Sequence, residues 1–298
     1  IRRPPRSTLD RSSAASDVYK RQLLPFPLIY LISDFVAYIL KNIIRYRKSI
    51  VYQNIKKTNL KLSKKQISSH VNEFYTHFSD VFLEMIKLDQ MSKKQIAKKF
   101  VLKNKELING YYKENKSVIL MASHYGGFEW CTTLDYFFKH KVVAIYTPLK
   151  DKVFNSIVYK SRSKHGIKLV PRTDSVNEII KLEKTNKNFI YGLAADQSPQ
   201  IRTINYWTDF LGVETLFFTG SERLAKELNI PVVFGEMKKI KRGKYQMEFK
   251  LIADSPLELK DKEITEIYKK MVENQIKTNP SYYFWTHRRF KHEKSSLT

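Results

Sequence analysis

The sequence predicts an α/β protein: a largely parallel central sheet flanked by helices, preceded by an N-terminal helical segment that associates with a membrane. Two observations carry this prediction. Short apolar runs alternate with polar helical stretches over residues 118–252, an order typical of parallel sheets. An apolar segment followed closely by basic residues lies near the start of the chain, as in helices that lie in a membrane interface.

Three stretches divide the chain. Residues 1–22 show neither helical nor strand periodicity and look like translated adaptor or vector sequence. A genuine basic, disordered N-terminal arm is the alternative. Residues 23–50 form the expected membrane-interface segment. Residues 51–298 are expected to form a single domain, because no Pro/Gly/Ser-rich linker interrupts residues 100–290.

The membrane-interface segment contains no clean apolar span of 18 residues, because Pro25, Pro27 and Asp34 interrupt its run from Leu23 to Leu40. Four basic residues follow it: Lys41, Arg45, Arg47 and Lys48. This arrangement favours a helix lying in the interface on the cytoplasmic side. A buried helix of a soluble protein is the alternative. If residues 1–22 are foreign, we expect that the natural N-terminus has been lost at the place where a membrane anchor would lie, which leaves open whether a spanning helix preceded Leu23.

Helical periodicity is strongest over residues 67–88, where apolar residues recur three and four positions apart. A second helix is expected near residues 92–99. Serine followed three residues later by glutamine, at Ser63 and at Ser92, predicts a capping box at the start of each helix. The final helix is expected over residues 261–277, stopped by Asn279 and Pro280.

The predicted strands are short apolar runs between these helices. They comprise Val118 to Ala122, Val142 to Tyr146, Phe189 to Ala194, Pro231 to Met237 and, less distinctly, Tyr245 to Ile252. Helices are expected near residues 127–139, 151–164, 174–185 and 219–228, the last starting in a Thr219-x-x-Glu222 capping box and ending at Asn229.

The chain carries a net charge of +25, and +21 without residues 1–22, which hold six basic and two acidic residues. Nucleic acid, an anionic membrane or an acidic or phosphorylated partner would suit this charge, although compositional bias accounts for part of it. The single cysteine, Cys131, excludes an internal disulfide and a cysteine-based zinc site.

Candidate site residues lie at the ends of three of the predicted strands: His124, the pair Tyr146 and Pro148, and Asp196. The carboxyl ends of parallel strands meet at one edge, where catalytic groups gather. His124 can act as a base near neutral pH, and Glu129 could hold its ring in one tautomer and stabilise the imidazolium. A satisfied polar pair without catalytic function is the alternative.

The motifs that other reaction types require are missing from the sequence. The sequence has no His-Glu-x-x-His helix, no Gly-x-Ser-x-Gly nucleophile elbow and no Gly-rich phosphate loop. A base without a protein nucleophile would activate a hydroxyl group of the substrate, which then attacks an acyl or phosphoryl donor.

His124-x4-Glu129 behind a strand resembles the HX4(D/E) motif of the lysophospholipid acyltransferase superfamily. More narrowly, an ordered set of blocks resembles the lipid A biosynthesis lauroyl/myristoyl acyltransferases. These blocks are Ser123 to Trp130, Tyr146 to Leu149, Arg162 to Gly166, Ala195 to Gln197, Thr219 to Ala225 with Pro231 to Val233, and Trp285 to Lys291. Gly127 departs from the family, in which Asn is common there.

The resemblance implies transfer of a fatty acyl chain from acyl carrier protein to a hydroxyl of a lipid A precursor. The expected partners are acyl carrier protein, an anionic glycolipid acceptor and a membrane surface, with no nucleic acid and no cofactor beyond the acyl donor. The implied location is the cytoplasmic face of the inner membrane of a Gram-negative bacterium. No covalent enzyme intermediate is needed, because the departing thiolate is a good leaving group.

Further residues are expected to bind substrate. Backbone N–H groups could stabilise the oxyanion, first in the turn after His124 and second at Gly220 and Ser221. The remaining candidates are Arg162 and Arg223 for phosphate, Asp196 for a sugar hydroxyl or for fixing a loop, Tyr146 for the pocket wall, and Arg288 for anionic lipid.

Two other functions remain open. An acyltransferase acting on another lipid, such as a lysophospholipid or an amino-acid lipid, would need the same base. A basic nucleic-acid-binding protein would use the charge and the 18 Tyr and 18 Phe residues, but no recognised binding motif is present.

Overall fold

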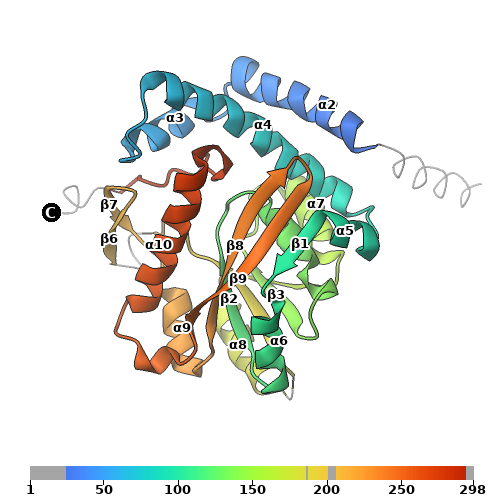
Figure 1. The fold of residues 1–298 in the computed structure, drawn as a ribbon, viewed down its shortest axis with the longest axis vertical. Coiled ribbons are helices and arrows are strands. Elements are labelled where there is room, and N and C mark those ends of the chain that lie inside the picture. Colours follow the sequence, from blue (N-terminus) through green and yellow to red (C-terminus); the bar gives the residue numbers. More distant parts are fainter. Residues whose placement is uncertain (1–24, 186, 201–205, 293–298) are drawn as a thin grey trace, which may run out of the picture.

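The computed structural model describes residues 25–185, 187–200 and 206–292, so the expectation for residues 1–22 lies outside the described residues. Helices flank a central seven-stranded sheet, with the order β1-β9-β8-β2-β5-β3-β4 (Figure 1). The strands are β1 Phe100–Lys103, β2 Val118–Ala122, β3 Lys141–Tyr146, β4 Lys168–Pro171, β5 Phe189–Ala194, β8 Val232–Lys241 and β9 Lys244–Ala253. The predicted fold class is confirmed.

Most of the sheet is parallel, which decides where a site can form. Strand β2 pairs in parallel with β5 and β8, and β3 pairs in parallel with β4 and β5. Strand β9 runs antiparallel to β8, and β1 runs parallel to β9. The carboxyl ends of β2, β3, β4, β5 and β8 therefore share one edge, at which the β8–β9 turn also lies. We call this the catalytic edge.

Most helices match the expected ranges closely, but those over residues 48–57 and 105–113 were not expected. The helices are α2 Phe26–Tyr38, α3 Lys48–Lys57, α4 Lys64–Leu88, α5 Lys93–Lys99, α6 Lys105–Lys113, α7 Lys152–Ser163, α8 Ser175–Glu183, α9 Gly220–Leu228 and α10 Glu263–Thr278. Short π and 3-10 helices are η1 Ile39–Ile43, η2 Phe128–Tyr136, η4 Pro256–Glu258 and η5 Pro280–Tyr282. The stretch expected as a helix near residues 127–139 is thus a 3-10 helix. A separate hairpin joins β6 Trp207–Phe210 to β7 Val213–Leu216.

Two of the three predicted capping boxes are present. The Ser63 and Ser92 side chains each accept a hydrogen bond from the amide three residues on, and the glutamine there bonds back. At α9 the prediction is wrong, because the Thr219 side chain caps nothing. The carboxylate of Glu222 instead accepts hydrogen bonds from the amide and hydroxyl of Thr265, a partner distant in the sequence.

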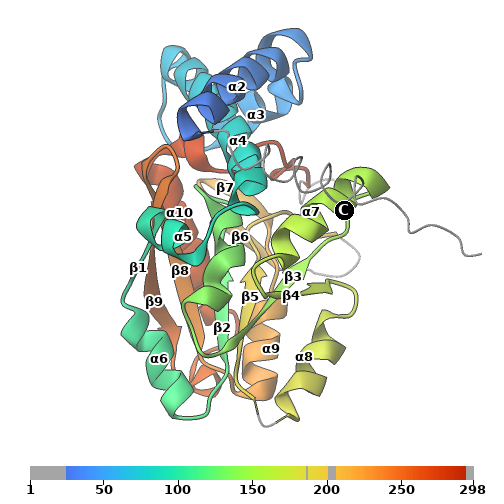
Figure 2. The ribbon, with the colours of Figure 1, turned by 90° about the vertical axis from the view of Figure 1, so that its right-hand side faces the viewer.

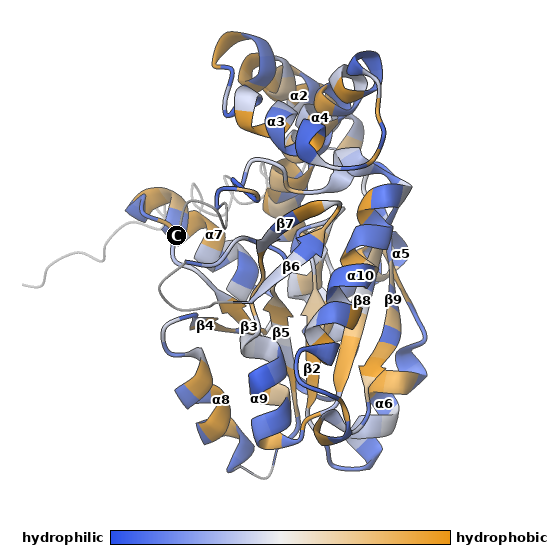
Figure 3. Cartoon of the chain, turned by 90° about the vertical axis from the view of Figure 1, so that its left-hand side faces the viewer, coloured by the Kyte–Doolittle hydropathy of each residue, from blue (hydrophilic) through white to orange (hydrophobic). Residues whose placement is uncertain are grey.

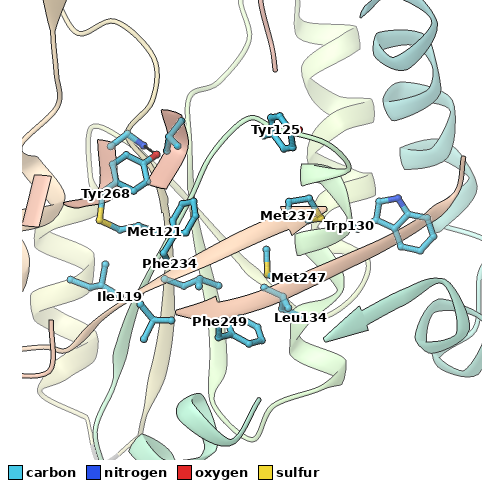
Figure 4. Close-up of a cluster of buried hydrophobic side chains, with 14 of the residues drawn as sticks. Ile119, Met121, Tyr125, Trp130, Leu134, Phe234, Met237, Met247, Phe249 and Tyr268 are labelled. Carbon is cyan, nitrogen blue, oxygen red and sulfur yellow. Dashed lines mark hydrogen bonds between the residues drawn. The ribbon is translucent and has the colours of Figure 1, made fainter. Parts of the chain in front are cut away.

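One large cluster of buried side chains lies around β2, β8 and β9. Figure 4 shows Ile119 and Met121 of β2 beside Phe234 of β8, with Trp130 and Leu134 lying toward β9. These side chains are at most 2% exposed. Such close packing leaves the strand ends little freedom to shift, so side chains at the catalytic edge are held on a rigid frame.

Helix α2 corrects one expectation. Phe26–Ile43 forms a continuous 18-residue helical segment that is long and apolar enough to cross a membrane. Pro25 is its N-cap and Pro27 lies in its first turn. Proline is tolerated there, because those amides have no partner within the helix. Expecting both prolines to break the run was therefore wrong.

Helix α2 lies against α4 (Figure 2), and polar side chains contribute to this contact. The Ser33 hydroxyl donates to the fully buried carboxylate of Asp80, 2.7 Å away. Arg242, in the β8–β9 turn, bridges Asp80 of α4 and Asp34 of α2 at 2.7 and 2.6 Å. Asp34, which interrupts an apolar run in the sequence, thus helps to hold the helix side-on against the domain.

We expect Arg242→Ala to lower the free energy of unfolding by about 2 kcal/mol, because the buried carboxylate of Asp80 then keeps only Lys239, 3.5 Å away, as a charged partner. Urea unfolding of the full chain measures this change. Arg223→Ala removes the same charge from an exposed position and should change stability by less than about 0.5 kcal/mol. Equal effects of the two substitutions would contradict the bridging role of Arg242.

Candidate active site

His124 and Asp196 meet at the catalytic edge because their strands are neighbours. His124 follows β2 and Asp196 follows β5, and these strands end side by side, with Ala122 opposite Ala194. The Asp196 Oδ1 atom lies 2.8 Å from Nδ1 of His124, and its Oδ2 accepts a 3.0 Å hydrogen bond from the backbone amide of His124. One carboxylate therefore fixes both the ring and the main chain of the histidine.

Burial and the contact between the two side chains together determine the protonation state of this pair. The Asp196 side chain is fully buried, whereas that of His124 is 27% exposed. Burial by itself would raise the pKa of Asp196, but the interaction with His124 outweighs it and the pKa is lowered. An ionised carboxylate only accepts, so Nδ1 carries the proton. The Nε2 atom has no hydrogen-bond partner among the described residues, so its lone pair is available.

The pKa of His124 is raised above its ordinary value. Removal of the ring from water acts to lower it, but the negative charge of Asp196 and the hydrogen bond to it act more strongly in the other direction. A raised pKa makes the neutral ring a better proton acceptor. His124 therefore has the geometry and the basicity that a general base needs.

The turn after His124 depends on two glycines. Gly126 has a φ of +58°, in the left-handed region that glycine favours, and its amide donates to the carbonyl of Tyr282. A side chain on Gly127 would begin 2.8 Å from the ring of Tyr245. Because Tyr245 occupies that space, this chain cannot carry the asparagine that is common here in the family it resembles.

Glu129 differs from its expected position. No hydrogen bond joins it to His124; its carboxylate makes a bidentate ion pair with Arg162 of α7, with one contact of 2.9 Å and one of 2.5 Å. Glu129 is 2% exposed and Arg162 26% exposed. The partner that orients His124 is therefore Asp196. The position of Arg162 beside Glu129 could not be read from either motif alone.

In the part of the chain that the structure describes, the other predicted residues make no hydrogen bond or ion pair with His124, Glu129 or Asp196. Tyr146 ends β3 with its ring 5.9 Å from that of Tyr159, and Arg288 is exposed on the C-terminal segment. Gly220 and Ser221 begin α9, and the exposed Arg223 lines a surface groove with Lys226 and Asp261. None of the four residues His124, Glu129, Arg162 and Asp196 lines that groove.

Two aromatic rings lie beside His124, and sequence reasoning assigned no role to them. The rings of Phe128 and Phe284 lie 5.3 and 6.1 Å from the imidazole. Phe78 and Phe82 of α4 extend this row, at 5.4 and 6.5 Å from Phe284. We call these four half-buried phenylalanines the aromatic wall. Phe284 belongs to the C-terminal segment, and its amide donates to the carbonyl of His124.

Tyr268 of α10 ties together the two strand ends that carry the pair. Its hydroxyl donates to the carbonyl of Ala122 at 2.7 Å and accepts from the amide of Ala195 at 3.2 Å. Tyr283 adds a hydrogen bond to the carbonyl of Asp196. Sequence reasoning gave Tyr268 no role, so the structure alone assigns it this position.

We expect Tyr268→Phe to lower the turnover number about tenfold, with KM changed much less, because the strand ends lose a common anchor. Steady-state kinetics would measure this split. Tyr111→Phe is the matched control, because it also removes a tyrosine hydroxyl. That hydroxyl donates a hydrogen bond to Asp254 on another part of the sheet. A Tyr268 variant that is destabilised but has normal turnover would leave Tyr268 with a purely structural role.

The fold and site define an α/β enzyme class in which a histidine at the sheet edge, oriented by a carboxylate, can act as a base. Among the described residues, no group of three or more His, Cys, Asp or Glu side chains could hold a metal ion. A family model described as bacterial lipid A biosynthesis acyltransferase matches residues 19–292. The chain therefore belongs to this acyltransferase family, as the sequence motifs indicated. A search of curated proteins finds no match.

Proposed function

We propose that the protein transfers a fatty acyl chain from acyl carrier protein to a hydroxyl group of an anionic lipid A precursor, at the cytoplasmic face of the inner membrane. The observation that carries the proposal is the pairing of His124 with Asp196, which leaves Nε2 free to accept a proton. Membership of the acyltransferase family supplies the reaction class.

The reaction would proceed by direct attack. Nε2 of His124 takes the proton of the acceptor hydroxyl while that oxygen bonds to the thioester carbonyl carbon. The tetrahedral intermediate collapses, the carbon–sulfur bond breaks, and the imidazolium returns the proton to the departing thiolate. Asp196 stabilises the imidazolium formed between these steps. The products are an ester and the free thiol of the carrier.

Glu129 would serve the substrate through Arg162. The bidentate pair uses Nε and Nη2 of the guanidinium and holds the group in one orientation. Its other N–H groups are then available for a phosphate, either on the sugar headgroup or on the pantetheine arm of the donor. Arginine is well suited to this task, because its donors lie in a rigid plane.

Two further elements would complete the site. The amides of Tyr125 and Gly126 already bond to the carbonyls of Ser123 and Tyr282, so the oxyanion donors would be the next amides, those of Gly127 and Phe128. The aromatic wall offers the fatty acyl chains of the lipid substrates an apolar surface beside the base. Gly220, Ser221, Arg223, Tyr146 and Arg288 remain candidate contacts for more distant parts of the substrates.

Mass spectrometry of lipid A tests the proposal. Cells that lack the protein are compared with cells complemented by the wild-type chain or by His124→Ala. We expect the wild-type chain alone to restore a species heavier by one acyl group, while thermal melting shows that the variant is folded. An unchanged lipid A profile would direct the search to another lipid acceptor, and full activity of His124→Ala would exclude this base.

A further inference from the structure

Helix α7 and the residues before it expose large apolar side chains beside the site. Val153 is 73% exposed, and Leu149, Phe154 and Ile157 are each more than 40% exposed. Ile86 of α4 is 47% exposed. We call these five residues the α7 surface. Val153 and Ile157 are four residues apart and therefore share one face of the helix. Figure 3 shows hydrophobic segments of α7 next to hydrophilic ones.

A row of aromatic rings connects the α7 surface to His124. The ring of Phe154 lies 6.3 Å from that of Phe82, which lies 6.5 Å from Phe284, and Phe284 lies 6.1 Å from the imidazole. The aromatic wall therefore begins at the base and ends at the α7 surface. An apolar molecule could pass between these points in continuous contact with aromatic rings.

The α7 surface lies toward the same end of the molecule as α2. Helix α7 begins six residues after β3 leaves the catalytic edge. The β8–β9 turn at that edge holds α2 through Arg242. Figures 2 and 3 show α2 and α7 in the same half of the molecule. Helix α2 exposes Leu31 and Phe35 at 66% and 65%, so a second apolar surface lies nearby.

Basic residues border the α7 surface. Lys150, Lys152 and Lys160 are exposed on α7 or just before it. The one acidic residue among residues 149–160 is Asp151, whose carboxylate is engaged in capping α7 by accepting from the Phe154 amide. Exposed apolar side chains among lysines are the composition that binds an anionic bilayer surface. Both apolar insertion and charge attraction would act together there.

We propose that the α7 surface contacts an anionic lipid bilayer together with α2, and that the lipid acceptor reaches His124 along the aromatic wall. The bilayer contact stands on the exposed residues and their charge, whereas the route of the acceptor rests on the proposed function. An enzyme held in this way takes its lipid substrate directly from the membrane, without moving it through water.

Partitioning onto vesicles of phosphatidylglycerol and phosphatidylethanolamine tests the bilayer contact. We expect the full chain with Val153→Glu and Ile157→Glu to bind about tenfold more weakly than wild type. The matched control, Leu251→Glu with Leu257→Glu, adds the same charge at exposed apolar positions near the far end of β9, and should change binding less than about twofold. Val153→Trp should strengthen binding, because tryptophan favours the membrane interface.

Equal binding by the α7 variant and the control would overturn the proposal. A variant that binds vesicles normally but loses acyl carrier protein would assign the α7 surface to that protein, and a changed oligomeric mass would assign it to a second copy of the chain. Both outcomes also overturn the proposal.

Activity measurements separate this proposal from the proposed function. The α7 variant should lose acyl transfer to an acceptor embedded in vesicles and keep transfer to the same acceptor dispersed in detergent. His124→Ala should bind vesicles like wild type and be inactive in both formats. Absence of transfer by the wild-type chain in both formats would refute the proposed function while leaving the vesicle-binding result intact.

Discussion

Asp196→Asn is expected to lower the rate of acyl transfer about a thousandfold without unfolding the protein. The carboxylate accepts two hydrogen bonds from His124, one from the main chain and one from the ring. An asparagine oxygen can replace only one of the two acceptors. If its amide group faces the ring, the proton moves to Nε2 and the base is lost.

The same substitution should also shift the pH dependence of the rate. Transfer requires neutral His124, so the rate rises with pH as the imidazolium loses its proton. Asp196 contributes to the raised pKa of His124, which places the wild-type midpoint above the ordinary histidine value. The midpoint of the Asp196→Asn variant should therefore lie at lower pH than that of wild type.

Initial rates across a pH series, measured under kcat/KM conditions, would test both expectations. Asp254→Asn makes the same chemical change near the other end of the sheet and should leave the rate and the midpoint unaltered. An Asp196→Asn midpoint identical to that of wild type would exclude Asp196 as the source of the raised pKa.

Glu129→Ala is expected to reduce acyl transfer at least a hundredfold and also to lower the free energy of unfolding by about 3 kcal/mol. The substitution leaves the guanidinium of Arg162, which is 26% exposed, without its ionic partner. Without Glu129, the guanidinium of Arg162 is no longer held in one orientation. Substrate binding is therefore weakened in addition to the loss of stability.

A double substitution separates these two effects. Glu129→Ala with Arg162→Ala removes both charges, so stability should recover by about 2 kcal/mol relative to Glu129→Ala, while transfer stays low. Urea unfolding and steady-state kinetics on the same preparations provide the comparison. If the double variant recovers activity, Arg162 does not bind substrate. If its stability does not recover, the pair is not coupled as the geometry indicates.

Sequence reasoning placed the strand ends well and the contacts between them poorly. Buried parallel strands have distinctive apolar runs, so the positions of His124 and Asp196 at one edge could be predicted. Strands β1, β4, β6 and β7 were missed, because each has only four residues and shows no usable period. Proline in the first turn of α2 was misjudged, because the helix start was not recognised.

The limit of prediction from the sequence is clearest in the identity of the carboxylate that pairs with His124. Spacing along the chain favoured Glu129, five residues on. The turn at Gly126, with its positive φ, leads into a 3-10 helix that directs Glu129 to Arg162 instead. Asp196 is 72 residues from His124 and becomes its partner through the pairing of β2 with β5.

The amino-acid sequence by itself determined the α/β class, the family and the histidine, because strand and helix periodicity and the local motif depend on neighbouring residues. Only the tertiary structure decided which carboxylate orients that histidine, how Tyr268 joins the strand ends, and which apolar side chains of α2 and α7 remain exposed. These features depend on strand order and on packing between elements far apart in the chain, and no local pattern records them.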